Sequence, residues 1–490
     1  MRAPPNAAAD ASSRRAPGVP LLVALSSLGT VLAPLNSTMV AVALPEIRHE
    51  FSLSHATVGW LISGYLIAMA VTQPIGGRLG DQIGRARVYR GGLLAFLALS
   101  LALSFSPNFA VLVALRIAQA IAGAVLIPNG MALLRVHAPA RQLGRLNGIN
   151  GAVVSFAAAA GPLIGAATLA VGSWRWLFPL SVPCIALALL LLRGLDEPPP
   201  ERTTRAPIDW PGTAAFVGVL VALTFQLEAV RGDGSAWMAT AGWIALAALS
   251  ALFVWRQQVS ASPAAEWRLF RSRSFAGATA YVLLTNLSMY TTLLMVPFFV
   301  RDVQDRGAAL AGLLLGAMSV LVAVVAPISG RLADEHGRRP AALAGAAIML
   351  GGAIMLLAGM RADVPTAYLA LCLAVLGLGL GAGVGAANTA AIEAAPRSLA
   401  GSASGTSSMM RYLGSIVGAG ILAGVLGEGS SAGDINTFRF VVGAVIATAA
   451  LAVVAAAFIH TFPRPEFEAV EAEEPGLRSA VRERAATEPA

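Results

Sequence analysis

The chain of 490 residues is much more apolar than a soluble protein of its length. Apolar residue types make up 57% of it and charged residues only 12%, whereas charged residues average about 25% in soluble domains. Apolar stretches of 17 residues or more recur from Val19 almost to His460. This composition excludes a soluble globule and predicts an all-α polytopic membrane protein.

The formal charge of +8 comes entirely from arginine, because all 34 basic residues are arginines. The surplus lies in the connections between apolar stretches, which suits an anionic membrane leaflet, so we expect no nucleic-acid partner. Cys184 and Cys372 fall inside apolar stretches and the five histidines are scattered. The sequence therefore predicts no disulfide framework, no metal site and no cofactor. The apolar stretch after residue 18 has no convincing cleavage site and reads as a retained span.

Fourteen segments are apolar enough to cross a bilayer, which takes about 20 residues of helix. Their approximate bounds are 20–43, 58–77, 91–106, 110–134, 147–171, 176–192, 211–230, 237–254, 276–298, 307–330, 341–360, 366–390, 402–426 and 440–459. Connections after even-numbered spans carry eighteen arginines and those after odd-numbered spans carry seven. Because positive charge is retained inside the cell, we expect both termini in the cytoplasm and the chain in the cytoplasmic (inner) membrane.

A short glycine-rich turn occurs twice. The sequence GRLGDQIGRAR from Gly77 to Arg87 recurs from Gly330 as GRLADEHGRR, which places Asp81 and Asp334 at equivalent positions, 253 residues apart. A second set of matches has an offset of 257: Pro139 with Pro396, Gly144 with Gly401, Gly148 with Gly405 and Gly161 with Gly418. Two related halves with a site between them are a common plan of secondary carriers.

The repeat predicts two pseudo-symmetric six-helix bundles joined by two extra transmembrane helices. The expected parts are a cytoplasmic tail (1–19), an N-terminal half (20–193), a linker with a two-helix insert (194–257), a C-terminal half (258–460) and an acidic cytoplasmic tail (461–490).

Each repeated turn places one acid among arginines, where glycines permit a tight reversal of the chain. The candidate gating residues are Gly77, Asp81, Gly84, Arg85 and Arg87, with the second-half copy Gly330, Asp334, Gly337, Arg338 and Arg339. We expect Asp81 to meet a helix N-terminus or an arginine of the opposite half in one state of the carrier. In the alternative interpretation, the arginines only fix the topology.

Two arginines lie inside apolar spans. Burying such a charge costs at least about 2.5–3.5 kcal/mol, so an embedded arginine is a functional candidate by default. Arg116 shares a helix face with Gln119, three residues on,. Arg411 is the second embedded cation. The alternative for both is a structural arginine bonded to neighbouring carbonyl groups.

These motifs resemble those of the major facilitator superfamily, and in particular its fourteen-spanner drug:proton antiporter branch, over roughly Pro20 to His460. The repeated turn is similar to motif A, and the segment LRIAQAIAG around Arg116 and Gln119 to motif B. GPLIG, with Gly161, Pro162 and Gly165, resembles the antiporter motif C, SWRWLF from Ser173 resembles the segment that follows it, and LNSTMVAVALP from Leu35 resembles the first-span motif of drug exporters. The resemblance implies alternating access, proton coupling, a role of Arg116 in proton movement or substrate binding, and a hinge or seam at motif C.

One departure from the branch concerns coupling. The first-span motif of the exporters usually begins with an aspartate, and this chain has Asn36 there, which cannot titrate,. Glu228 is the only acid within the fourteen predicted spans. The candidate protonation sites are therefore Asp81 and Glu228. The scarcity of acids argues against dicationic substrates and favours neutral, weakly cationic or anionic amphiphiles.

Further polar side chains could line a substrate pathway, although each alone could equally form an interhelical hydrogen bond. The candidates are Asn36, Thr38, Tyr65, Asn129, Asn286, Tyr290, Asn388 and Arg411. Asn286 and Tyr290 share a helix face because they are four residues apart.

We expect a monomeric secondary transporter in the lipid bilayer, which exports hydrophobic drug-like small molecules with protons as the coupling ion. The first alternative is a carrier or facilitator for a specific neutral or anionic metabolite or lipid without proton antiport, and a remote one is a non-transporting sensor or scaffold. No phosphate-binding loop or nucleophile–base motif predicts an enzyme,.

Overall fold

The computed structural model describes residues 19–137, 143–193, 209–229, 236–260, 267–396, 399–425 and 434–461, and within these ranges the chain is helical without a strand. The N-terminal helices are α1 (Val19–Glu50), α2 (His55–Ile83), α3 (Arg85–Leu103), α4 (Phe109–Ala124), α5 (Leu126–His137), α6 (Leu143–Val171) and α7 (Val182–Leu192). Then come α8 (Trp210–Ala229), α9 (Ala236–Val259), α10 (Arg273–Phe298), α11 (Ala308–His336), α12 (Arg338–Ala358), α13 (Thr366–Glu393), α14 (Ala400–Val425) and α15 (Ile435–Ala457). The all-α prediction is confirmed.

The spans agree with the predicted segments in order, but differ from them in detail. Thirteen helices of the described residues are long and apolar enough to cross a membrane, and α6, 29 residues long, lies in the place of the predicted fifth span. The predicted fourth span is interrupted at Val125, between α4 and α5. The predicted sixth span begins with two short 3-10 helices, Trp174–Leu177 and Pro179–Ser181, because Pro179 and Pro183 lack the amide hydrogens that a continuous helix needs,.

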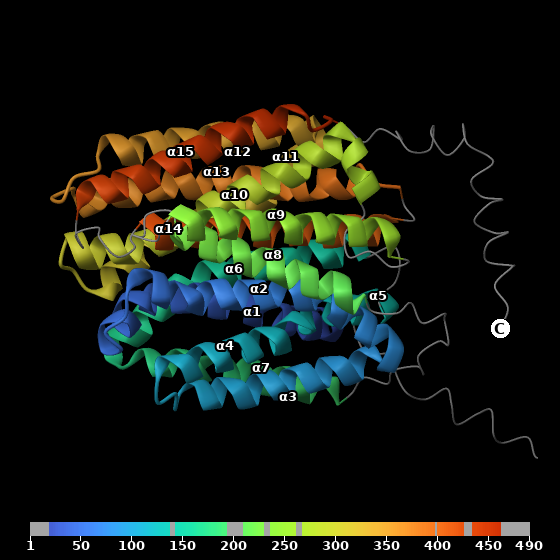
Figure 1. The fold of residues 1–490 in the computed structure, drawn as a ribbon. Coiled ribbons are helices and arrows are strands. Elements are labelled where there is room, and N and C mark those ends of the chain that lie inside the picture. Colours follow the sequence, from blue (N-terminus) through green and yellow to red (C-terminus); the bar gives the residue numbers. More distant parts are fainter. Residues whose placement is uncertain are drawn as a thin grey trace, which may run out of the picture.

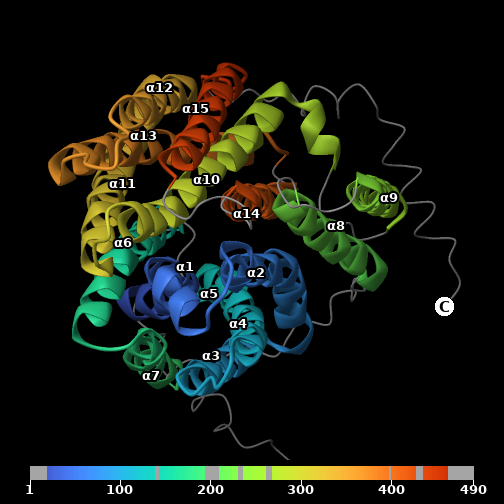
Figure 2. The ribbon, with the colours of Figure 1, turned by 60° about the vertical axis from the view of Figure 1, so that its left-hand side comes forward.

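The helices lie side by side as a bundle with two parts (Figures 1 and 2). Helices α1–α7 form the N half and α10–α15 form the C half. The halves meet where α1 packs on α10, α2 on α14 and α6 on α11. Gly312 and Gly316 of α11 permit a close approach, since a Cβ at either position would collide with Ala166 or Leu163 of α6,.

The two extra helices pack beside this junction. Helix α8 contacts α2 of the N half and α14 of the C half. The Trp60 and Phe225 rings are 4.9 Å apart where α2 meets α8. Helix α9 packs on α8 and exposes Trp237, Trp243 and Trp255. Tryptophans near both ends of an otherwise apolar helix are typical of a surface that faces lipid.

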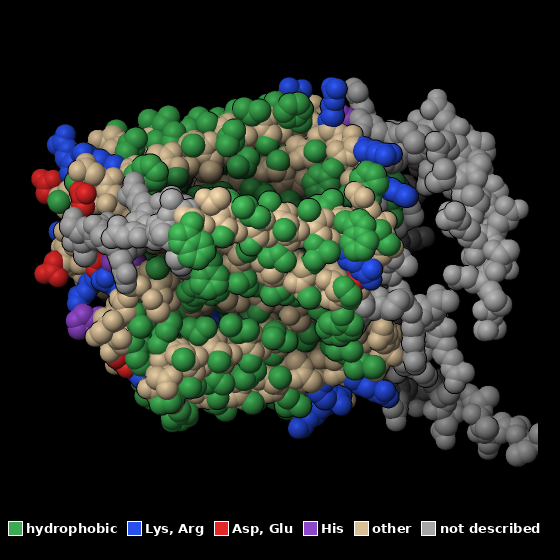
Figure 3. All heavy atoms as spheres, viewed as in Figure 1, with side chains coloured by type: hydrophobic (Ala, Val, Ile, Leu, Met, Phe, Trp, Pro, Cys, Tyr) green, Lys and Arg blue, Asp and Glu red, His purple; other side chains and the backbone are tan. Residues whose placement is uncertain are grey.

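The bundle has two ends, named here after two acids. The Asp302 end holds the last turn of α1, the first turn of α2 and the π-helical turn η5 (Phe299–Val303). The Asp81 end holds the α2–α3 and α11–α12 turns. On the face seen in Figure 3, acidic side chains gather at the Asp302 end, on the left.

Candidate functional site

Arg116 of α4 is completely buried inside the N half. Its Nη2 donates a 3.1 Å hydrogen bond to the backbone carbonyl of Asn36, and Nη1 donates to Asn36 Oδ1 and to Gln119 Oε1. The guanidinium also lies 4.0 Å from the centre of the Tyr65 ring, a cation–π contact. Every one of these partners is neutral, so none of them offsets the positive charge of Arg116.

Asn36 and Gln119 hold this arginine in place. Gln119 in turn donates a 2.7 Å hydrogen bond to Ser100 of α3, which ties α3 to α4. The Nδ2 atom of Asn36 and the Nε atom of Arg116 are buried and have no hydrogen-bond partner. The site thus contains more donors than acceptors.

Arg411 of α14 has a similar neutral partner in the C half. Its Nη2 donates a 3.1 Å hydrogen bond to Asn388 Oδ1 of α13, which also accepts a 3.2 Å hydrogen bond from Ser407. The Nε atom of Arg411 is buried and without a partner. Each half therefore contributes one arginine that is held by an asparagine oxygen.

Two contacts near the middle of the spans connect the halves. The hydroxyls of Ser37 on α1 and Tyr290 on α10 are 3.4 Å apart. Gln73 of α2 donates a 2.7 Å hydrogen bond to the hydroxyl of Tyr412 on α14. Tyr412 also packs against the buried cluster that contains Tyr65, the ring next to Arg116. We call Asn36, Tyr65, Arg116, Tyr290, Asn388, Arg411 and Tyr412 the central cluster.

Three of the predicted pathway residues form their hydrogen bonds within their own half of the bundle. Asn129 donates to the carbonyls of Gly76 (2.8 Å) and Val125 (2.7 Å), so it joins α2 to the interruption between α4 and α5. Thr38 bonds to carbonyls of its own helix and contacts α6. Asn286 is buried and lies one helical turn before Tyr290. Its side chain donates a 2.8 Å hydrogen bond to the carbonyl of Val282 in the same helix.

The motif C segment of α6 touches both halves. A Cβ on Gly161 would collide with Thr38, and one on Gly165 would lie 3.0 Å from the Met39 carbonyl, so α6 packs tightly on α1. The carbonyl of Pro162 would lie 2.7 Å from a Cβ on Gly312 of α11. This segment is therefore a seam between α1 and the opposite half.

The two motif A turns share their backbone geometry. Gly84 and Gly337 have φ angles of 105° and 99°, a region that residues with a Cβ rarely adopt. Arg85 donates to Asp81 at 2.9 and 3.0 Å within the first turn. The Asp81 side chain is 58% exposed. The ion pair described for it joins two residues of the same turn and does not reach the opposite half. Arg87 is exposed, and a Cβ on Gly77 would lie 3.5 Å from the Cβ of Pro128.

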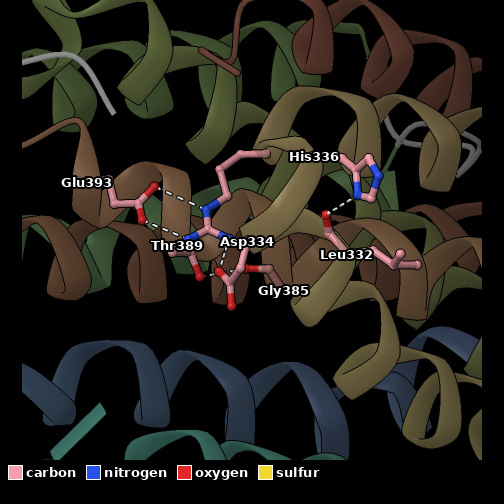
Figure 4. Close-up of polar contacts among 7 residues, drawn as sticks. Leu332, Asp334, His336, Gly385, Thr389 and Glu393 are labelled. Carbon is pink, nitrogen blue, oxygen red and sulfur yellow. Dashed lines mark hydrogen bonds and ion pairs between the residues drawn. The ribbon is translucent and has the colours of Figure 1, made fainter. Parts of the chain in front are cut away.

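The second turn has an additional acid (Figure 4). Arg338 contacts Asp334 and also donates to Glu393 of α13 at 2.9 and 3.2 Å. Asp334 is 67% exposed, and Arg339 is exposed as well. A Cβ on Gly330 would meet nothing within 4 Å. Glu393, which the motif does not include, thus fixes Arg338 to a neighbouring helix of the same half.

At the Asp302 end a cluster absent from the sequence predictions joins the halves. Asp302 of η5 accepts a 2.8 Å hydrogen bond from Arg48 of α1, and His55 Nε2 of α2 lies 2.9 Å from its other oxygen. The ring of Phe298 is 5.0 Å from that of His55 and 5.8 Å from the Arg48 guanidinium. We call these four residues the Asp302 latch. Glu228, the other candidate proton site, lies in the last turn of α8, and its side chain is outside the described residues.

The structure is a bundle of two helical halves. Ion pairs connect the halves at the Asp302 end, and buried polar side chains lie where the halves meet. This is the architecture of a membrane transporter. Residues 26–419, and again 307–487, match the profile of the Major Facilitator Superfamily. The chain belongs to this superfamily and is a multi-pass membrane transporter, which indicates a transport function rather than an enzymatic one.

Curated relatives cover most of the chain. An uncharacterized MFS-type transporter of Bacillus subtilis, YvkA, is 31% identical over 400 residues, 82% of this chain and 89% of that protein. The tetracenomycin C resistance and export protein of Streptomyces glaucescens is 30% identical over 372 residues, 75% of this chain and 68% of that protein. The multidrug resistance protein Stp of Mycobacterium tuberculosis is 31% identical over 342 residues, 69% of this chain and 63% of that protein.

Solved structures support the fold. The inward open conformation of the Escherichia coli xylose transporter XylE has a TM-score of 0.64 at 15% identity and covers 93% of this chain and 99% of that chain. A structure of a D-xylose–proton symporter has a TM-score of 0.63 at 14% identity, covering 91% and 98%. At this identity the likeness concerns the fold alone.

Proposed function

We propose that this transporter exports hydrophobic, drug-like or amphiphilic compounds by alternating access, driven by the proton gradient. The observation that carries the proposal is the unequal closure of the two ends. The Asp302 latch joins the halves at one end, whereas at the other end Asp81 and Asp334 are exposed and pair within their own half. Two of the relatives are named as a resistance and export protein and as a multidrug resistance protein, which supports the direction of transport and the substrate class.

The arginine distribution gives this asymmetry a direction. Connections at the Asp81 end carry the larger number of arginines, which supports a cytoplasmic location of that end and of both termini,. In this orientation we propose that the structure represents an inward-facing state, because the ion pairs that join the halves lie at the opposite, outer end. Helix α2 packs along α14 of the opposite half, and α14 begins at the Asp81 end. In the outward-facing state the N-terminus of α14 is therefore the partner we propose for Asp81, because helix N-termini attract carboxylates.

A second candidate function is supported by Asn36. In a carrier of the fourteen-spanner antiporter branch an acid is expected at this position, and here an amide binds Arg116. A carrier for a specific neutral or anionic metabolite, without proton exchange, would suit this arrangement. A non-transporting sensor would retain the fold but move no substrate.

Transport in reconstituted vesicles tests the proposal. Purified protein is placed in liposomes with an imposed pH gradient, and the movement of a fluorescent amphiphile is followed together with an internal pH dye. Export coupled to protons predicts substrate movement that dissipates the gradient. Substrate movement without proton movement supports the second candidate. If no member of a broad amphiphile panel moves, while an Asp81→Asn control and the wild-type chain insert equally well, the exporter proposal is wrong.

A further inference from the structure

The central cluster contains two positive charges without a described negative partner. Arg116 comes from the N half and Arg411 from the C half, and their described hydrogen-bond acceptors are amide and carbonyl oxygens. The acids that form ion pairs in the described residues lie near the ends of helices or in turns: Glu50, Asp81, Asp209, Asp302, Asp334 and Glu393. Within the part of the chain that the structure describes, neither cation therefore has an acidic partner.

The unpaired atoms of the cluster are all donors. They are the Nε atoms of Arg116 and Arg411 and the Nδ2 atom of Asn36. Arg116 is 0% exposed and Asn36 is 1% exposed. A buried donor without a partner destabilises the protein, and a charged donor does so more strongly. A bound group that offers only acceptor oxygens would remove this cost at several atoms at once.

Tyrosines surround the two charges and connect the halves. The Tyr290 hydroxyl is 3.4 Å from that of Ser37, the neighbour of Asn36. Tyr412 packs against the buried cluster that contains Tyr65, whose ring lies 4.0 Å from the Arg116 guanidinium. Tyr412 follows Arg411 in α14 and bonds to Gln73 of the opposite half. These rings offer apolar and aromatic surface next to the cations. The arrangement suits a molecule with a ring and a single acidic group.

We propose that the central cluster is a binding site for an amphiphilic organic anion, whose carboxylate or sulfonate is shared by Arg116 and Arg411 and whose ring lies among the tyrosines. The inference rests on the proposed transport function, and it narrows the substrate class from amphiphiles in general to anions. Because each arginine belongs to a different half, a shared anion would also draw the halves together around it.

A matched pair of probes tests this without any transport step. Coumarin-3-carboxylate and coumarin-3-carboxamide have the same ring and differ in charge. Their binding to the purified full-length protein in detergent is measured by fluorescence titration. We expect at least about tenfold tighter binding of the carboxylate, since hydrogen bonds to charged groups are among the strongest available. Equal affinity for the two probes, or binding of neither, overturns the proposal.

Three variants locate the site. Arg116→Gln and Arg411→Gln should each weaken carboxylate binding at least about tenfold and leave carboxamide binding within about twofold. Asn36→Asp is the sharpest variant, because it supplies an isosteric counterion to Arg116 and should abolish the preference for the anion without removing volume. Retention of the full preference in Asn36→Asp, or in both arginine variants, would contradict the assignment.

Arg361→Gln provides the matched control. Arg361 is exposed in the connection between α12 and α13, so the change removes the same charge outside the cluster and should leave both affinities unchanged. Binding also separates this inference from the proposed function. Anion-selective binding without transport would refute the proposed exporter function but support the anion site. Proton-coupled transport of uncharged amphiphiles, with no preference for the anionic probe, would support the exporter function and refute the anion site.

Discussion

Asp302 and Arg48 form a 2.8 Å ion pair between the C half and the N half, with the aspartate only 8% exposed. His55 contacts the same carboxylate at 2.9 Å, so a single acid of η5 holds two elements of the opposite half. Hydrogen bonds to a charged group contribute about 1.5–3 kcal/mol each. These interactions therefore stabilise the conformation in which the Asp302 end is closed, relative to the one in which it is open.

Substitution Asp302→Asn keeps the shape of this side chain and removes its charge, so we expect the Asp302 end to open more often. The change in population should be roughly tenfold, from the lower limit of the hydrogen-bond energies. The measurement is labelling of Ser37→Cys, at the junction of the halves, by a membrane-impermeant maleimide in a chain with both native cysteines replaced by serine. The matched control is Asp363→Asn, an exposed acid at the same end, and equal labelling of the two variants would show that the latch does not control opening.

Asp81→Asn should abolish turnover and leave insertion and thermal stability close to those of the wild-type chain. In this structure the carboxylate is 58% exposed and its ion pair to Arg85 crosses the turn at Gly84, and exposed pairs contribute only about 0.2–1 kcal/mol. Its importance lies in the other state, where we expect it to meet the opposite half. Unchanged turnover in vesicles would reduce the first motif A turn to a topology signal.

Hydropathy identified the spans because each has to be apolar along its length, and Arg116 was recognised because a charge interrupts such a run. The Asp302 latch could not be recognised in this way. Arg48, His55 and Asp302 lie near helix ends, where charged residues are common, and only the packing of α1 and α2 against α10 brings them together. Glu393 is a similar case, since it meets Arg338 across 55 residues of sequence.

Some of the predicted pathway side chains lie in the central cluster and others do not, and the sequence alone could not distinguish the two groups. A polar residue inside a span satisfies its hydrogen bonds with whichever group lies nearest, and sequence alone does not show which helix that is. Asn129 lies against α2 and therefore bonds to the Gly76 carbonyl, while Asn388 lies near α14 and bonds to Arg411. Both asparagines lie inside apolar spans, but their hydrogen-bond partners differ.

Two glycines of the second motif A turn should respond differently to alanine. Gly337 has a φ angle of 99°, and a Cβ there would also collide with Thr461. Gly337→Ala should destabilise the protein by about 1–2 kcal/mol, the cost of a left-handed residue with a Cβ, or by more if Thr461 does not move. Gly330→Ala is the control, because Gly330 is helical with no neighbour within 4 Å. Thermal unfolding in detergent should show a lower midpoint for Gly337→Ala alone, and equal midpoints would contradict the strain.

The seam between motif C and α11 makes a final prediction. A Cβ at Gly312 would collide with Ala166 and would lie 2.7 Å from the carbonyl of Pro162. Gly312→Ala should therefore force α6 and α11 apart, and overpacking of this kind costs about 1–3 kcal/mol. Because the seam joins the two halves, we expect the variant to favour opening at the Asp302 end, as Asp302→Asn does, with increased maleimide labelling of Ser37→Cys. Gly351→Ala in α12, where a Cβ would have no neighbour within 4 Å, should label as the parent chain does. If Gly312→Ala also labels as the parent does while its thermal midpoint falls, α6 and α11 serve only to hold the fold together, and the latch alone controls the opening of this end.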